Sequence, residues 1–269
     1  MTSLVNLTRH GPVALITVDN PPVNALSQPV RAGLRDAIKH ANEGESRLIV
    51  LICSGRTFFA GADISEFGKP PADPWLPELV NQVESSAIPV IAAIHGTALG
   101  GGLETAMACH YRIALASAKL GLPEVSLGLL PGAGGTQRSP RLIGVEAALE
   151  LMTSGKPVSA RQAREAGLVD RVVDGDLQES ALEYAHELIG AGAGPRRTSE
   201  LPLESSHLPA GYFDGMRAAV GKKTRGLPAP QRIIDCVEAA TKMDFTSGSA
   251  IEREAFMEMM MSPESAGLR

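Results

Sequence analysis

Short apolar runs and amphipathic repeats alternate along the first two thirds of the chain. Residues 47–53 are almost wholly apolar and rich in β-branched side chains, which is typical of a strand buried on both faces, and 89–94 resemble them. A Gly/Pro break lies between two apolar segments near the start and predicts a hairpin there. The predicted strands cover residues 5–9, 13–18, 47–53, 89–94, 111–116 and 168–173.

Helical spacing of apolar residues separates these strands. Val30, Leu34, Ile38 and Ala41 recur at intervals of three and four, and Ser27 is placed to cap the helix that they predict. The predicted helices cover residues 27–42, 73–86, 101–109, 145–154, 159–167 and 176–188. Because strands and helices alternate, the pattern favours parallel strand pairing and an α/β architecture.

The pattern changes after residue 190. Segment 191–230 is rich in Gly, Pro and Ser and has little periodicity, so we expect a linker or a loosely packed connection between a core of residues 1–190 and a helical region of residues 231–269. Two helices are predicted in that last region, at 230–242 and 248–261. The second carries many methionines, and we expect this soft apolar surface to pack in the core or against another subunit, with contact to a ligand as the lesser alternative.

Composition narrows the class of protein. The chain has 269 residues, 44% of them hydrophobic, which is enough for a sizeable core. Its net charge of -5 gives no general electrostatic reason to bind nucleic acid or an anionic membrane surface. The longest apolar runs are far too short to span a bilayer.

The compartment is predicted from the cysteines and the N-terminus. The three cysteines are odd in number and widely spaced, so we expect buried, reduced thiols. The first residues show no basic stretch followed by an apolar one, and no secretory signal is predicted. We therefore expect a cytoplasmic protein.

Three glycine-rich turns mark the first half, at 59–64, 96–104 and 130–137. Glycine lets backbone N–H groups point in unusual directions and lets a ligand approach closely. A helix that begins at Gly101 or Gly102 would add free N–H groups and the positive end of its dipole, an arrangement that suits an oxyanion. Tight turning and close helix packing are the alternative explanation for such clusters.

Other common sites are not indicated. The 130–137 turn has no P-loop lysine, and neither a G-x-G-x-x-G segment after a strand nor a G-x-S-x-G elbow is present. The six histidines are scattered without metal-ligand spacing, so no metal site is expected.

Two glutamates occur in apolar surroundings. Glu104 follows three glycines inside an apolar run, and Glu124 follows Gly121-Leu-Pro. Each alone could be a hydrogen-bonded turn or capping residue. As a pair they suggest acid–base chemistry, because partly desolvated carboxylates can have pKa values that differ enough to give one acid and one base near neutral pH.

At these residues the chain resembles the crotonase (enoyl-CoA hydratase/isomerase) superfamily. Ala60-Gly-Ala-Asp-Ile64, Gly100-Gly-Gly-Leu-Glu104 and Gly121-Leu-Pro-Glu124, which continues into Pro131-Gly-Ala-Gly-Gly-Thr-Gln-Arg138, occur in order and at the family's spacing. The resemblance covers about residues 5–190 and is strongest to the N-terminal part of multifunctional β-oxidation enzymes. Those enzymes continue into an NAD-dependent dehydrogenase, whereas this sequence reaches Arg269 without a dinucleotide fingerprint; a stand-alone relative and a fragment both stay open.

The resemblance implies a fold, a reaction and an assembly. The fold would be a spiral of ββα units with a C-terminal helical region, and the assembly a homotrimer or a dimer of trimers. The reaction would be reversible hydration of 2-trans-enoyl-CoA, with the Δ3,Δ2-enoyl-CoA isomerase reaction or another crotonase-type reaction as the alternative. A third hypothesis, RNA binding, would need a basic surface, and 25 Lys+Arg against 30 Asp+Glu give it no global support.

It also implies roles for individual residues. The N–H groups of Ala62 and Gly101 would form the oxyanion hole for the thioester carbonyl, Glu104 would act as base toward water, Glu124 as proton donor, and the Gly132 backbone would position the water. Backbone contacts to the CoA substrate are implied for Val23, Asn24, Ala25, Leu26, Ala62, Asp63, Ile64, Ser65 and Gly101. No metal or redox cofactor is implied, since coenzyme A is part of the substrate.

Overall fold

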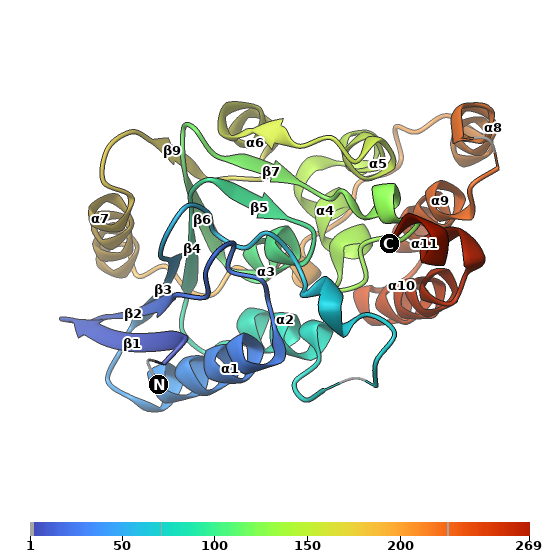
Figure 1. Ribbon diagram of the computed structural model, residues 1–269. Helices are drawn as coiled ribbons and strands as arrows, with labels where there is room; N and C mark the ends of the chain where they lie inside the picture. Colours follow the sequence, from blue (N-terminus) through green and yellow to red (C-terminus); the bar gives the residue numbers. More distant parts are fainter. Residues whose placement is uncertain (1–2, 71, 225) are drawn as a thin grey trace.

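The computed structural model describes residues 3–70, 72–224 and 226–269, and within them the strands form two sheets (Figure 1). The main sheet has the order β1-β2-β3-β4-β6-β9, parallel except for the β1–β2 hairpin. The small sheet has the order β5-β7-β8. The strands are β1 Val5–His10, β2 Val13–Val18, β3 Leu48–Cys53, β4 Val90–Ile94, β5 Thr97–Leu99, β6 Tyr111–Leu115, β7 Lys119–Gly121, β8 Val158–Ser159 and β9 Arg171–Val173.

Twice along the chain, a strand of the main sheet is followed by a strand of the small sheet and then by a helix. Strand β4 is followed by β5 and then by a helix, and β6 is followed by β7. This repeated path confirms the predicted spiral of ββα units and the α/β class. The predicted buried strand at 47–53 is also confirmed, since all six residues of β3 are buried.

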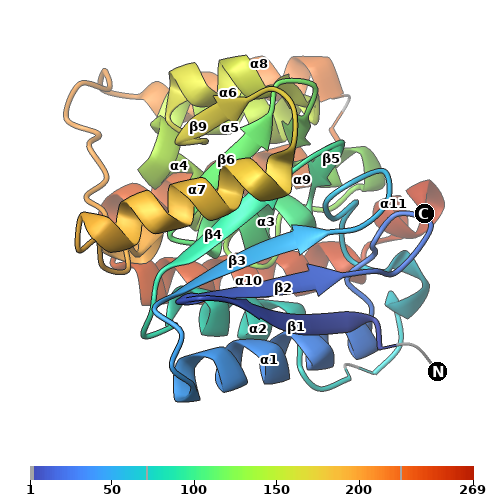
Figure 2. The same cartoon turned by 90° about the vertical axis from the view of Figure 1, so that its left-hand side faces the viewer.

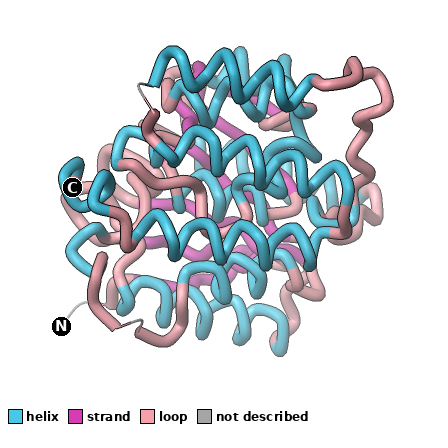
Figure 3. The backbone as a smooth tube through the Cα atoms, turned by 90° about the vertical axis from the view of Figure 1, so that its right-hand side faces the viewer, coloured by secondary structure: helices cyan, strands magenta, loops and turns pink. Residues whose placement is uncertain are grey.

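Helices cover both faces of the main sheet. Helix α7 crosses one face (Figure 2), where Leu177, Ala181 and Tyr184 pack on side chains of β2, β3, β4 and β6. The opposite face carries the larger core, behind a layer of helices (Figure 3). The helices are α1 Gln28–Glu43, α2 Leu76–Glu84, α3 Gly101–Ala108, α4 Gly135–Ile143, α5 Val145–Ser154, α6 Ala160–Ala166, α7 Leu177–Gly190, α8 Tyr212–Thr224, α9 Pro228–Lys242, α10 Phe245–Met260 and α11 Pro263–Leu268, with the 3₁₀ turns η1 Ile64–Glu66, η2 Glu124–Leu127 and η3 Thr198–Glu200.

One helix cap and one helix boundary differ from the sequence predictions. Helix α1 begins after Ser27 as predicted, but the cap is the carboxylate of Glu66, whose Oε1 accepts from the Gln28 N–H at 2.7 Å. Helix α2 begins at Leu76, three residues later than predicted. The carbonyls of Asp73 and Pro74 accept hydrogen bonds from α1 side chains, so this segment is held as a connection against α1.

Segment 191–230 differs from the predicted linker in its local structure. Helix α8 lies within it, and Val220 is buried. Before that helix, Thr198 is buried and donates to the Met107 carbonyl at 2.8 Å, while the Ser199 N–H donates to Glu84 at 2.9 Å. The weak periodicity arises because α8 buries few of its residues fully, and because η3 is anchored by hydrogen bonds that leave no hydrophobic pattern.

Helices α9 and α10 confirm the two predicted late helices, and α10 packs against the segment that leads into α4. Within the described part of the chain, no helix is both long and apolar enough to cross a membrane.

Candidate active site

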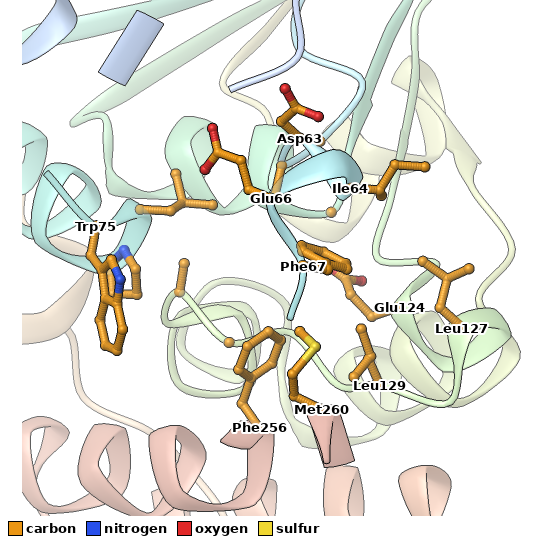
Figure 4. A pocket seen from close by; sticks show the side chains of 18 of the residues that line it. Asp63, Ile64, Glu66, Phe67, Trp75, Glu124, Leu127, Leu129, Phe256 and Met260 are labelled. Carbon is orange, nitrogen blue, oxygen red and sulfur yellow. The ribbon is translucent and has the colours of Figure 1, made fainter. Parts of the chain in front are cut away.

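One cavity of about 510 Å³ collects most of the predicted site residues. Its wall is built from η1 and the segment that follows, the start of α3, η2, the turn before α4, and one face of α10. Figure 4 shows Phe256 and Met260 projecting from α10 towards Phe67 and Glu124. The predicted residues that line the cavity are Ala62, Asp63, Ile64, Gly101, Glu104, Glu124 and Gly132.

The other predicted contacts lie beside this cavity. Segment 23–26 runs along segment 60–62: the Ala60 N–H donates to the Val23 carbonyl at 3.2 Å, and the Leu26 N–H donates to the Gly61 carbonyl at 2.9 Å. The Asn24 amide nitrogen donates to two backbone carbonyls away from the cavity. Neither Val23, Asn24, Ala25, Leu26 nor Ser65 lines the cavity, so their contact with CoA stays a prediction.

Ala62 and Gly101 meet at one edge of the cavity. A Cβ built on Gly101 would lie 3.3 Å from the Ala62 nitrogen and 2.6 Å from Leu76 Cδ2, so a larger residue here would displace its neighbours. Gly101 is the first residue of α3, and its N–H therefore has no partner within the helix. Among the described residues, no acceptor is hydrogen-bonded to either N–H group. Two backbone donors thus lie close together at an apolar cavity.

Glu104 lies deep in this site. Its carboxylate Oε1 accepts from the Ala133 N–H at 2.7 Å and from the Gly135 N–H at 2.8 Å. Burial raises the pKa of Glu104 well above its usual value, and the charges of Glu124 and Glu252 raise it further, against the effect of the two N–H donors.

Glu124 approaches the same cavity from η2. Its Oε1 lies 2.8 Å from the position that a Cβ on Gly100 would take. Its Oε2 is buried and has no hydrogen-bond partner in the described part of the chain. Burial raises the pKa of Glu124 to about 8, and the charge of Glu252 contributes in the same direction. The two carboxylates thus differ in their contacts: Glu104 Oε1 accepts two backbone N–H groups, whereas Glu124 Oε2 accepts none in the described part of the chain.

Sequence reasoning missed a third buried carboxylate, Glu252 on α10. Its Oε1 accepts from the Gly134 N–H at 2.6 Å, and its Oε2 accepts from the Thr136 N–H at 2.9 Å. The available signal was its spacing: Gly248, Glu252, Ala255 and Met259 share the buried face of α10, where a charge is unexpected.

Arg31 and Glu66, also missed, line the cavity, and Arg31 holds the segment before α2 against α1. The Arg31 guanidinium, 4% exposed, donates to the Pro74 carbonyl at 2.7 Å and to Glu66 Oε2 at 2.8 Å. Further along this segment the Trp75 ring lies 4.7 Å from the guanidinium of Arg253 on α10. These contacts join α1, segment 74–75 and α10 at the wall of the cavity.

No group of three or more His, Cys, Asp or Glu side chains in the described residues has the geometry to hold a metal ion. The three cysteines are buried. Desolvation raises the pKa of Cys109 and of Cys236 to about 12, which makes both thiols poor nucleophiles.

Comparisons with known proteins lead to one family. The family profile for enoyl-CoA hydratase/isomerase matches residues 8–197. The chain belongs to this family. It is 45% identical over 259 residues to a peroxisomal bifunctional enzyme of Danio rerio and 37% identical over 262 residues to that of Homo sapiens. These alignments cover 96% and 97% of the chain but 36% of each relative, so the chain spans about a third of their length.

Two solved structures superpose on nearly the whole chain. An enoyl-CoA hydratase from Bacillus anthracis is 31% identical, with a TM-score of 0.66, and the alignment covers 97% of this chain and 92% of that one. A Pseudomonas aeruginosa structure named DspI is 30% identical with a TM-score of 0.67, and its alignment also covers 97% of this chain. The sequence resemblance to the crotonase superfamily is thereby confirmed.

Proposed function

We propose that this family member catalyses the reversible addition of water to the double bond of 2-trans-enoyl-CoA, giving 3-hydroxyacyl-CoA as in fatty-acid β-oxidation. The observation that carries the proposal is the placement of two buried carboxylates in one apolar cavity, next to two unpaired backbone donors. An enzyme named enoyl-CoA hydratase is among the structures that superpose over nearly the full chain.

The N–H groups of Ala62 and Gly101 would receive the thioester oxygen. As water attacks C3, negative charge moves from the double bond onto this oxygen and forms an enolate. Donors that are already in place stabilise such charge strongly in a water-excluded site, by about 2.7–4 kcal/mol for a single donor. The close contact between Gly101 and the Ala62 nitrogen supports this role.

Glu104 and Glu124 would move the two protons of the reaction. Glu104, as carboxylate, would remove a proton from the attacking water, which the Gly132 backbone helps to position. Glu124, protonated at neutral pH because its pKa is raised to about 8, would deliver a proton to C2. One acid and one base on the same cavity meet the needs of hydration in a single site.

The acyl chain of the substrate would occupy the apolar part of the cavity. Phe67, Trp75 and Leu76 line it from one side, and Phe256 and Met260 from α10 line it from the other. These side chains offer no charged partner, so they favour a hydrocarbon chain.

The test uses crotonyl-CoA, whose enoyl-thioester absorbance disappears on hydration. We expect turnover by the wild-type protein and losses in kcat of about 10²- to 10⁴-fold in Glu104→Gln and in Glu124→Gln. Comparable turnover by all three proteins would contradict the assignment of the pair.

Isomerisation of Δ3- to Δ2-enoyl-CoA is the second candidate, because the matched family is described as hydratase/isomerase. It would use the same oxyanion hole and needs proton transfer without added water. Incubation with a 3-enoyl-CoA, followed by chromatography of the products, distinguishes the two reactions: an isomerase yields the 2-enoyl isomer, and a hydratase alone leaves the substrate unchanged.

Assembly and compartment are further parts of the proposal. The expected assembly is a homotrimer or a dimer of trimers, which light scattering would test. The relatives are named peroxisomal, while the sequence features predict the cytoplasm, so the location stays a prediction that imaging of the tagged protein would test.

A further inference from the structure

Helix α10 contacts the turn before α4 through Gly248, Glu252 and Phe256. These three residues are spaced four apart and therefore lie on one face of the helix. At one end, a Cβ built on Gly248 would lie 2.1 Å from Gln137 Oε1. At the other end, a Cβ built on Gly132 would lie 2.4 Å from Phe256 Cδ2. Both ends of the row therefore sit directly against residues 132–137.

Glu252 is the middle residue of this row and is 2% exposed. Besides the Gly134 and Thr136 N–H groups, its carboxylate accepts the Thr136 hydroxyl, with 2.5 Å between Oγ1 and Oε2. Three donors from the turn thus converge on one carboxylate from a helix more than 100 residues away in the sequence.

The donors of the turn are divided between two carboxylates. The N–H groups of Ala133 and Gly135 donate to Glu104, whereas those of Gly134 and Thr136 donate to Glu252. Because the four N–H groups are consecutive, the position of Glu252 and the position of the Glu104 oxygen are fixed by the same stretch of backbone.

We infer that Glu252 is a positioning residue for the hydration reaction: it fixes turn 132–136, and through this turn it holds the Glu104 carboxylate and the Gly132 backbone in place for the attacking water. This inference rests on the proposed function. Glu252 acts through the turn, while Glu104 and Glu124 are the groups placed to exchange protons with the substrate.

The charge of Glu252 has a second effect at the same site. The titratable and charged groups that face it are Glu104 on α3, Glu124 on η2, Arg138 on α4 and Cys236 on α9. Burial and then the negative charge of Glu252 raise the pKa of Glu124. Removal of that charge lowers this pKa, and the alkaline limb of the activity profile moves to lower pH.

Glu252→Gln tests both effects. The amide offers one acceptor oxygen and one donor nitrogen, so it cannot accept from Gly134 and Thr136 together. We expect kcat for crotonyl-CoA hydration to fall on the order of 10- to 100-fold, because displacement of a catalytic group by about 1 Å costs this much. We expect KM to change little and the alkaline limb to shift to lower pH.

Two further variants separate position from charge. Glu252→Asp keeps the charge but shortens the side chain, so kcat should fall while the alkaline limb stays near its wild-type pH. Glu254→Gln removes the same charge from an exposed site on the same helix and should leave kcat and the pH profile unchanged. If Glu252→Gln fails to fold, Thr136→Val removes the hydroxyl donor and should also lower kcat with little change in KM.

The outcomes are distinct. Wild-type kcat and an unshifted limb in Glu252→Gln, or wild-type kcat in Thr136→Val, would overturn the positioning role. A loss of stability in Glu252→Gln with an unchanged kcat per folded molecule would overturn it too, since that is a purely structural effect. A wild-type protein that does not hydrate crotonyl-CoA would instead contradict the proposed function.

Discussion

Two glycine-rich turns lead into short helices, and they differ in whether the protein supplies acceptors for their free N–H groups. At the turn before α3, Gly101 lines the cavity together with Ala62, and neither N–H group has an acceptor among the described residues. At the turn before α4 the N–H groups of residues 133–136 are all taken by carboxylates of the protein. The first turn is open to a ligand, and the second is closed.

The difference comes from distant residues. Both turns have glycines that permit close approach, and both precede a helix N-terminus that favours negative charge. Only at the second do carboxylates, from α3 and from α10, accept hydrogen bonds from the N–H groups of the turn. A glycine-rich turn therefore becomes a ligand site or a structural anchor according to what the rest of the chain brings to it.

The largest expected effect comes from loosening the closed turn at Arg138. This buried guanidinium donates to Glu84 Oε2 at 2.7 Å and to the Ala133 carbonyl at 3.1 Å. Burial alone would raise the pKa of Glu84, but the Arg138 charge and hydrogen bond lower it below its usual value. Arg138→Met leaves that carboxylate unpaired and should lower the free energy of unfolding by about 3–5 kcal/mol in denaturant titrations.

The matched control for this variant is Arg161→Met, at an exposed position on α6, which should change the free energy of unfolding by less than about 0.5 kcal/mol. Equal stability of the Arg138 and Arg161 variants would contradict the view that the closed turn is anchored by buried charge.

The next effect concerns the open turn. In Gly101→Ala the new methyl group would collide with Leu76 and crowd the Ala62 nitrogen. We expect kcat for enoyl-CoA hydration to fall about 10²-fold, the effect of losing one oxyanion donor. Gly190→Ala, whose added Cβ meets no atom within 4 Å, is the control for the substitution itself. Full activity of Gly101→Ala would show that this edge of the cavity is not used.

The pH dependence of hydration tests Glu124 as the proton donor at the cavity. Glu124 must be protonated to donate, and its raised pKa of about 8 keeps it so at neutral pH. The kcat/KM for hydration should therefore fall as pH rises through about 8. A profile that is flat from pH 6 to 10 in the wild-type protein would count against Glu124 as the donor.

The smallest expected effect is on the pH dependence of Tm in Glu124→Gln. A glutamate whose folded pKa is raised from 4.5 to about 8 stabilises the fold at low pH, and this contribution is lost as pH rises from about 5 to 8. Glutamine stays neutral, so Glu124→Gln should have a higher Tm than wild type at pH 8, and the difference should disappear near pH 5. A lower Tm of the variant at pH 8 would argue that the site is not desolvated.

Elements with strong local signals were predictable from the sequence. The buried strand β3 and the helix after Ser27 have continuous apolar runs or clear helical spacing, and Glu104 and Glu124, which the motifs singled out, line one cavity. Helix α4 was not predicted, because its glycine-rich start has low helix propensity and its N–H groups are satisfied by Glu104 and Glu252, both distant in sequence.

The same reason explains why Glu252, Arg31 and Glu66 were missed as site residues. Glu66 caps α1 from another segment, and Arg31 binds carbonyls more than 40 residues away as well as Glu66. Such long-range polar contacts leave no periodic pattern, whereas burial of a strand or of a helix face does.

The most direct test of the central claim is hydration of 2-trans-enoyl-CoA in water enriched in ¹⁸O and deuterium, followed by mass spectrometry of the product. We expect the wild-type protein to form 3-hydroxyacyl-CoA with one ¹⁸O at C3 and one deuterium at C2. The rate of its formation should be about 10²-fold or more lower in Glu104→Gln and in Glu124→Gln. Recovery of unchanged substrate, or of a positional isomer without ¹⁸O, from the wild-type protein would contradict it.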